Sequence, residues 1–239
     1  MLSALNIVLG LCLLAQLSED PANSVRRFEA RYRSASTLEA TFLEQYSDNG
    51  RVVRASAGVA SFRRPGKMRW EYHAPDDSLF LVDGKSAWFY VPADHTVTRV
   101  PAKRSSDWRT PLALLAGESK LSRMCSALYQ ATTEQPQNPG SVVLFCALKG
   151  AEGGKALATD NRETAAQEKG AVAFLEIEPA TGILNRVLIK QPGGVALEFK
   201  FANWHFNPPL PDSLFHFSPG PGVAIVNGEL PGGEGLMNR

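Results

Sequence analysis

Residues 58–90 constrain the fold of this chain more than any other stretch, because apolar and polar residues alternate along much of it. The alternation is cleanest over residues 67–73, where three large apolar residues are separated by charged ones. Successive side chains of a strand point to opposite faces, so this pattern predicts a strand with one apolar and one polar face. Turn residues separate it from two further strand-like segments, 79–83 and 87–91. The stretch is therefore predicted to form an antiparallel meander.

The rest of the chain continues in the same way. An amphipathic helix is expected over residues 18–34, and an almost wholly apolar helix over residues 110–117, which must be buried or cover an apolar opening. Residues 150–170 are polar and glycine-rich and are expected to be a mobile loop. About ten or eleven strands remain, at residues 38–46, 52–64, 67–73, 79–83, 87–91, 97–100, 121–132, 141–148, 171–177, 183–191 and 195–206.

These elements predict a mainly β protein with a few helices. We expect a single curved antiparallel sheet that forms an open, incomplete β-barrel, with a helical lid over a hydrophobic cavity. A sheet of this size can also pack solid, and the sequence does not separate a cavity from a filled core. We see no linker composition between residues 36 and 221, so we expect one domain over residues 19–226 and a flexible tail over residues 227–239.

The N-terminus and the net charge bear on where the protein works. The first 17 residues are apolar and uncharged, which is typical of a secretory signal peptide, expected here over residues 1–18. A retained N-terminal anchor is the alternative, and either one exports the protein. The chain has 239 residues and a formal net charge of +1. This near-neutral balance argues against nucleic acid as a partner, because phosphate backbones require a clustered basic surface.

Cys125 and Cys146 flank a segment rich in proline, glutamine and asparagine that is expected to be a hairpin loop. If the centre of the hairpin lies near residues 135–136, the two cysteines lie opposite each other, within reach of a disulfide. In an exported protein a structural disulfide is the leading expectation, and two buried free thiols are the alternative.

The sequence contains none of the common catalytic motifs. The nucleophile elbow, the phosphate-binding loop and the zinc-protease motif are all missing, and the four histidines do not stand at metal-ligand spacing. Asp76 and Asp77 are adjacent acids before a strand, a pattern that more often marks a solvated turn than a catalytic pair. We therefore expect a binding protein rather than an enzyme, without a metal or a cofactor.

Five segments, taken in order, carry a more specific pattern. They are 42–45 (FLEQ), 58–70 (GVASFRRPGKMRW), 82–90 (VDGKSAWFY), 110–115 (TPLALL) and 215–223 (FHFSPGPGV). Their glycines, prolines and aromatic residues resemble the motifs of the LolA family, the periplasmic carriers of outer-membrane lipoproteins. Each motif alone is weakly specific, but five in the expected order are much more so.

The resemblance implies a function as well as a fold. LolA proteins are monomeric carriers that take the acyl chains of lipoproteins from an ATP-driven inner-membrane complex and deliver them to an outer-membrane acceptor, without hydrolysing anything. Arg64 aligns with the arginine that latches the lid of the empty form, and an exposed arginine at a strand end is the alternative. The candidate cavity residues, for which ordinary core packing is the alternative, are Phe42, Phe62, Met68, Trp70, Leu81, Trp88, Tyr90, Leu112, Leu114, Leu115, Phe199 and Phe201.

Two other functions fit the same pattern. The protein could carry a free lipid or glycolipid instead of a lipoprotein. It could also be an envelope sensor or regulatory module whose sheet binds another protein.

Overall fold

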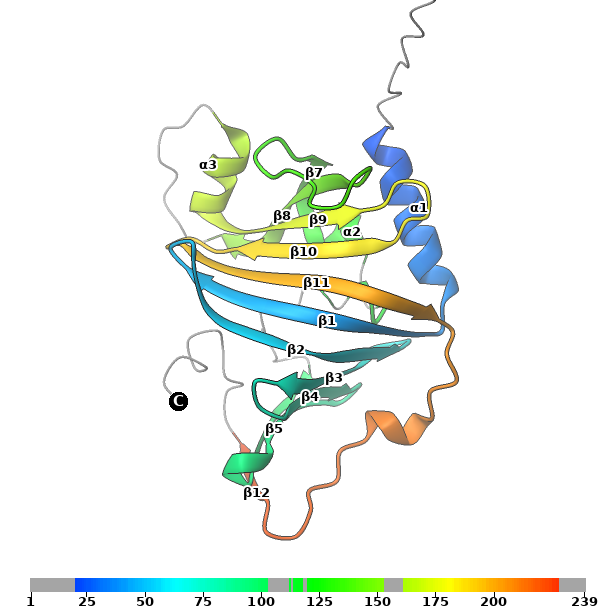
Figure 1. The fold of residues 1–239 in the computed structure, drawn as a ribbon, viewed down its shortest axis with the longest axis vertical. Coiled ribbons are helices and arrows are strands. Elements are labelled where there is room, and N and C mark those ends of the chain that lie inside the picture. The colour runs from blue at the N-terminus through cyan, green and yellow to red at the C-terminus, as the bar shows by residue number, and fades with distance from the viewer. Residues whose placement is uncertain (1–19, 103–111, 113, 118–119, 153–160, 228–239) are drawn as a thin grey trace, which may run out of the picture.

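The computed structural model describes residues 20–102, 112, 114–117, 120–152 and 161–227. The expected signal peptide and almost all of the expected C-terminal tail lie outside these residues. Within them, one mixed sheet of twelve strands dominates, in the order β12-β6-β5-β4-β3-β2-β1-β11-β10-β9-β8-β7. The sheet does not close, because β12 and β7 form its two edges and do not pair with each other. The expected open barrel is therefore confirmed (Figure 1).

Most of the sheet follows the chain order, with short turns between neighbouring strands. The strands are β1 (Thr37–Asp48), β2 (Arg51–Arg63), β3 (Lys67–Ala74), β4 (Ser78–Asp83), β5 (Ser86–Val91), β6 (Thr96–Pro101), β7 (Cys125–Gln130), β8 (Val142–Glu152), β9 (Gly170–Ile177), β10 (Leu184–Lys190), β11 (Val195–Phe206) and β12 (Ala224–Asn227). The helices are α1 (Pro21–Ser34), α2 (Leu121–Met124) and α3 (Arg162–Lys169), with short 3-10 turns η1 (Pro92–Asp94) and η4 (Asp212–Phe215).

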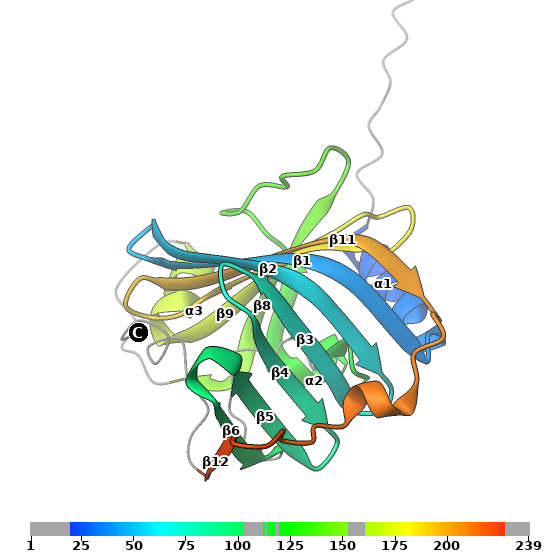
Figure 2. The same ribbon diagram turned by 60° about the horizontal axis from the view of Figure 1, so that its bottom comes forward.

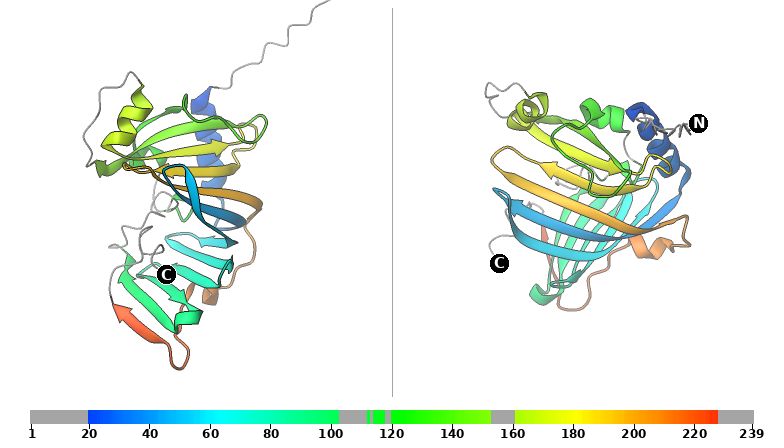
Figure 3. Two further views of the ribbon diagram at one scale, coloured as in Figure 1. Left: turned by 60° about the vertical axis from the view of Figure 1, so that its left-hand side comes forward. Right: turned by 45° about the horizontal axis from the view of Figure 1, so that its top comes forward.

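The long strand β1 is the centre of the sheet, because β2 pairs with one of its sides and β11 with the other. From this centre the sheet bends, so that β3–β6 form one arm and β7–β10 the other (Figures 2 and 3). Side chains from both arms meet in one apolar cluster inside the bend. The concave face of the sheet is therefore the core of the molecule.

Helix α1 packs on this concave side at the end of the sheet where β9 turns into β10. Asp20 caps the helix by accepting a hydrogen bond from the Ala22 backbone N–H, and Pro21 occupies the first turn. Phe28 and Tyr32 are buried in the central cluster. Gly182 lies in the turn with a φ of +74°, and a Cβ there would meet the α1 backbone at 2.8 Å. A glycine is needed because the helix and the turn approach so closely.

Three expectations about the fold were wrong. The strand expected over residues 121–132 begins as helix α2 (Leu121–Met124), and β7 covers only Cys125–Gln130. Strand β12 pairs with β6 in parallel, because the C-terminal segment crosses the molecule and enters the sheet edge in the same direction as β6. The segment expected to be a mobile loop contains α3, which Asn161 caps through the backbone N–H groups of Glu163 and Thr164. Three of its four glycines precede the helix, and most residues within α3 are good helix formers.

Cys125 and Cys146 form a disulfide, with Cα atoms 5.2 Å apart. The register that led us to expect it was inaccurate, since Cys146 pairs with Leu128 and Cys125 with Leu148. An irregularity between Cys125 and Ala127 shifts the ladder, and the bond joins the two strands diagonally. It ties β7, the outermost strand of its arm, to β8.

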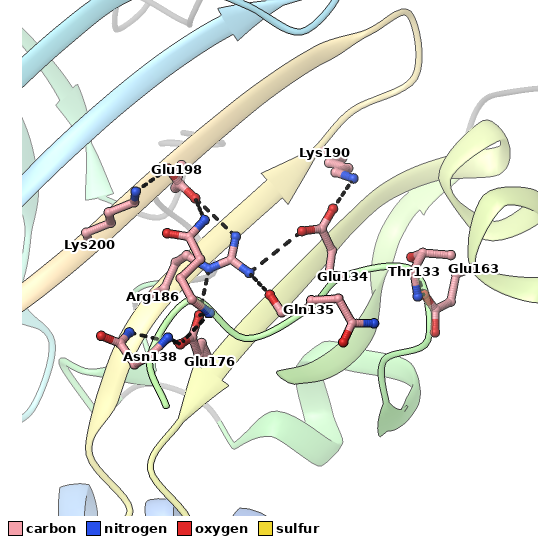
Figure 4. Close-up of polar contacts among 11 residues, drawn as sticks. Thr133, Glu134, Gln135, Asn138, Glu163, Glu176, Arg186, Lys190, Glu198 and Lys200 are labelled. Atoms are coloured by element: carbon pink, nitrogen blue, oxygen red, sulfur yellow. Dashed lines mark hydrogen bonds and ion pairs between the residues drawn. The ribbon is translucent and has the colours of Figure 1, made fainter. Parts of the chain in front are cut away.

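A polar network lies on the outer, convex face of β9–β11, under the loop that joins β7 to β8 (Figure 4). The guanidinium of Arg186 contacts Glu176 at 2.9 Å and Glu198 at 3.1 Å, and also donates to the Gln135 carbonyl. Glu176 in turn accepts hydrogen bonds from the backbone N–H groups of Gln137 and Asn138. The β7–β8 loop is thus fixed to the sheet by charges that the sequence alone did not reveal.

The start of this loop, just after β7, is bound by Glu163 of α3. Its carboxylate accepts hydrogen bonds from the backbone N–H groups of Thr132 and Thr133, at 2.7 and 2.9 Å, and from both hydroxyls. Burial alone would raise the pKa of Glu163, but these hydrogen bonds outweigh it and hold the pKa below its usual range.

A glutamate with a lowered pKa in the folded protein stabilises the fold above its ordinary pKa of about 4.5. We therefore expect Glu163→Gln to lower the urea midpoint at pH 7, and the difference from wild type to shrink as the pH falls through 4.5 and below. The measurement is urea unfolding of both proteins between pH 3 and 7. A difference that stays constant across this range would show that the charge on Glu163 contributes nothing.

Candidate functional site

The concave face of the sheet carries a cluster of aromatic rings around Trp70. The ring of Trp70 lies 4.9 Å from that of Phe42, 5.6 Å from Phe62 and 5.4 Å from Phe199, measured between centroids. All four side chains are almost completely buried. In this conformation the rings pack against one another, so aromatic side chains occupy the centre of the open barrel.

Nine of the twelve candidate cavity residues belong to this interior cluster. They are Phe42, Phe62, Met68, Trp70, Leu112, Leu114, Leu115, Phe199 and Phe201. They come from β1, β2, β3, β11 and the segment after β6, which the fold brings together although they span most of the chain.

The other three, Leu81, Trp88 and Tyr90, were placed wrongly. They lie on the opposite face, where they form a separate cluster with Phe217 and Val223 of the C-terminal segment. Their neighbours along β4 and β5 face the interior instead. Both strands carry apolar side chains on both faces. The sequence therefore shows which residues share a face, but not which of the two faces points inward. The C-terminal segment covers the second set, and Phe217 packs 5.5 Å from the Trp88 ring.

The lid expected over residues 110–117 is described at Leu112 and at residues 114–117. Leu112, Leu114, Leu115 and Ala116 are buried in the interior cluster. Hydrogen bonds of the i→i+3 type link Leu115 to Leu112 and Gly117 to Leu114, at 2.9 and 3.1 Å. The described part of the segment is thus a tight apolar turn that covers the aromatic interior. The first two residues of the expected helix, Thr110 and Pro111, lie outside the described residues.

Arg64 contacts the lid directly. Its Nε donates to the Leu115 carbonyl and one terminal nitrogen to the Leu114 carbonyl, each at 3.3 Å. The backbone N–H of Gly66 donates to the next carbonyl, that of Ala116, at 3.0 Å. The turn between β2 and β3 therefore binds three consecutive lid carbonyls. Burial, with a smaller contribution from the nearby charge of Arg33, lowers the pKa of Arg64 from its usual value.

Gly117 is the lid residue that lies against the Arg64 side chain. Its φ is +80°, and a Cβ built there would lie 3.0 Å from the Cδ of Arg64. In the sequence, Gly117 was only the last residue of the helix expected over residues 110–117. Its second role, leaving room for the arginine, depends on a contact between residues more than fifty positions apart.

The interior also holds a carboxylate that sequence reasoning overlooked. Glu44 lies on the inward face of β1 and is 6% exposed, and the Tyr72 hydroxyl donates a 2.7 Å hydrogen bond to it. The strand alternation of β1 could have revealed it, because Phe42, Glu44 and Tyr46 occupy successive inward positions. The inner face of the sheet is therefore apolar at its centre and carries a carboxylate toward the β1–β2 hairpin.

The residues that could have carried other chemistry lie apart from this interior. Asp77 and His73 are solvent-exposed and 3.9 Å apart at the strand end. Over the described ranges, no group of three or more potential metal ligands comes together. None of the helices in the same ranges is long and apolar enough to cross a membrane.

Comparison with known proteins agrees with this geometry. Residues 33–139 match the model of the family described as "Outer membrane lipoprotein carrier protein LolA". The outer-membrane lipoprotein carrier protein of Nitrosomonas europaea is 30% identical over 223 residues, which cover 92% of this chain and 96% of the relative. This chain belongs to the LolA family. The protein of the same name from Nitrosospira multiformis is 27% identical over 86% of this chain and 89% of the relative.

A solved structure shares the fold of this chain. An uncharacterized conserved protein from Thermus thermophilus superposes with a TM-score of 0.51 at 12% identity, over 86% of this chain and 98% of that protein. At such low identity the likeness concerns the fold alone. The resemblance drawn from the five motifs is thus confirmed at the level of the family.

Proposed function

We propose that this protein is a periplasmic carrier that binds the acyl chains of lipoproteins inside its open barrel and moves them from the inner to the outer membrane. The observation that supports this best is the lid. An apolar segment covers an aromatic interior and is held there by hydrogen bonds from Arg64 to its carbonyls. The names of the LolA relatives support lipoprotein as the cargo.

Opening the lid would expose the site. The interior rings fill the barrel in the present conformation, so acyl chains require the lid and the rings to move apart. Burial of acyl chain is favourable by about 0.8 kcal/mol per methylene. A hydrogen bond to a charged group contributes about 1.5–3 kcal/mol. A few methylenes are therefore enough to offset the two Arg64 contacts, which lets cargo open the lid and lets a more apolar acceptor remove the cargo.

The proposal includes the partners of that transfer. The carrier receives its cargo from an inner-membrane lipoprotein-releasing transporter of the ATP-driven type and passes it to an outer-membrane acceptor. It works as a monomer and binds cargo without a chemical step. Export to the periplasm relies on residues 1–18 acting as a signal peptide.

Native mass spectrometry tests the cargo. The protein is purified from a periplasm without detergent and then mixed with a triacylated lipoprotein or with its unacylated form, in which the lipid-bearing cysteine is replaced. We expect a one-to-one complex with the acylated form only. Binding of both forms equally would favour a sensor that recognises protein surface. A co-purified lipid of small constant mass, without lipoprotein uptake, would favour a carrier of free lipid.

A further inference from the structure

A pocket of about 240 Å³ is lined by α1, by Leu114 and Gly117 of the lid, and by Lys120 and α2. Phe28, Tyr32, Leu114 and Leu121 form its apolar floor. The charged lining residues are Glu29, Arg33, Arg64, Lys120 and Arg123, and Gly117 completes the lining. The pocket thus adjoins the lid and lies at the edge of the apolar interior, to which its floor residues belong.

Among the described residues, the lining carries four cations and one carboxylate, a net excess of three positive charges. The single carboxylate is already engaged, because Glu29 contacts Arg33 at 3.3 Å and accepts a hydrogen bond from the Leu121 backbone N–H. The whole chain has a net charge of only +1, so this local excess is not a general property of the surface. Like charges held together around a concavity favour binding of an anion.

The size of the pocket indicates how large that anion is. Sites for whole drug-sized ligands have volumes of roughly 300–1,000 Å³, and this pocket is smaller. It suits a compact polar group rather than an acyl chain. Guanidinium groups match the oxygens of phosphate in a forked geometry, and an ammonium adds a point charge. Arg33, Arg64 and Arg123 supply the first kind of group, and Lys120 the second.

We infer that this pocket binds a phosphate-type anion, either inorganic phosphate or the phosphate of an anionic lipid headgroup. The anion would contact Arg64 while that side chain still binds the lid. Two of its five N–H groups hold lid carbonyls, which leaves donors for the anion. Burial and the charge of Arg33 lower the pKa of Arg64, and an anion beside it would offset both effects.

Occupancy would hold the lid closed. The pocket is formed by the lid in its closed position, where Leu114 and Gly117 line it beside α1. A ligand that binds one conformation more tightly shifts the population toward that conformation. Phosphate should therefore slow hydrogen exchange of the backbone N–H of Gly117, which donates to Leu114 within the lid.

The test compares binding of three probes to the full mature protein by calorimetry. The probes are inorganic phosphate, dihexanoyl phosphatidic acid as a monomeric anionic lipid, and dihexanoylglycerol as its uncharged counterpart. Wild type should bind the first two saturably. The double variant Lys120→Ala with Arg123→Ala should bind both at least about tenfold more weakly. A matched control, Arg51→Ala with Lys85→Ala, removes two exposed cations elsewhere and should bind like wild type.

The relative affinities identify the source of the anion. Lipid binding at least about tenfold tighter than phosphate would assign the pocket to a headgroup, and equal affinities would assign it to free phosphate. No saturable binding to wild type, or equal binding by wild type and the pocket variant, would overturn the anion site. Unchanged exchange at Gly117 on saturation would overturn its coupling to the lid.

The anion site goes beyond the proposed carrier function, and the two can fail separately. Loading of acylated lipoprotein is measured on the same proteins. A wild-type protein that loads lipoprotein but does not bind phosphate would contradict only the anion site. One that binds phosphate but does not load lipoprotein would contradict only the carrier function.

Discussion

Replacing Arg64 with leucine is expected to leave loading of acylated lipoprotein intact and to slow its transfer to an acceptor by at least about tenfold. The substitution removes two hydrogen bonds from a cation to lid carbonyls. Such bonds contribute about 1.5–3 kcal/mol each, and at 3.3 Å they lie at the weak end of that range. When the closed, empty form is less stable, the equilibrium between the empty and the loaded carrier shifts toward the loaded form, and cargo is released less readily. Every 1.4 kcal/mol changes this equilibrium about tenfold. The measurement is the rate at which labelled lipoprotein passes to outer-membrane vesicles.

Arg63→Leu is the matched control for this experiment. Arg63 is the preceding residue, but its guanidinium donates to the Leu210 carbonyl and lies over the Phe215 ring, away from the lid. We expect transfer by this variant to be close to wild type. Normal transfer by Arg64→Leu, or equal slowing by both variants, would contradict the latch.

Replacing Arg186 with methionine is expected to lower the free energy of unfolding by about 3–5 kcal/mol. The side chains of Arg186 and Glu176 are 3% and 0% exposed, so the substitution leaves a carboxylate buried without its guanidinium partner. It also removes the contacts to Glu198 and to the Gln135 carbonyl, which fix the β7–β8 loop. Urea unfolding at neutral pH, with the midpoint and slope both fitted, measures the loss.

Lys190→Met provides the comparison on the same strand. Lys190 contacts Glu134, but both side chains are partly exposed, at 26% and 19%. Ion pairs of this kind contribute about 1 kcal/mol or less. Equal losses for the two variants would show that burial of the Arg186 network adds nothing to stability.

The interior could be predicted from sequence where a strand has one polar face. In β3 the charged residues identify the outer side, and in β1 most polar residues do so, although Glu44 faces inward. Phe42, Met68 and Trp70 were therefore placed correctly. In β4 and β5 apolar residues stand on both sides, and Leu81, Trp88 and Tyr90 were placed on the wrong one. The deciding fact was the path of the C-terminal segment, which covers the outer face of these strands.

The sequence by itself determined most of the strands, the apolar lid segment and the family, because alternation, turn residues and ordered motifs are local properties of the chain. Only the tertiary structure decided which carbonyls Arg64 binds, which cations gather around the α1 pocket and how Arg186 is neutralised. Arg64 and Leu115 are 51 residues apart, and Arg186 and Gln135 are also 51 apart. Such contacts depend on how the sheet bends and where the loops cross it, and the local pattern around each residue does not encode that geometry.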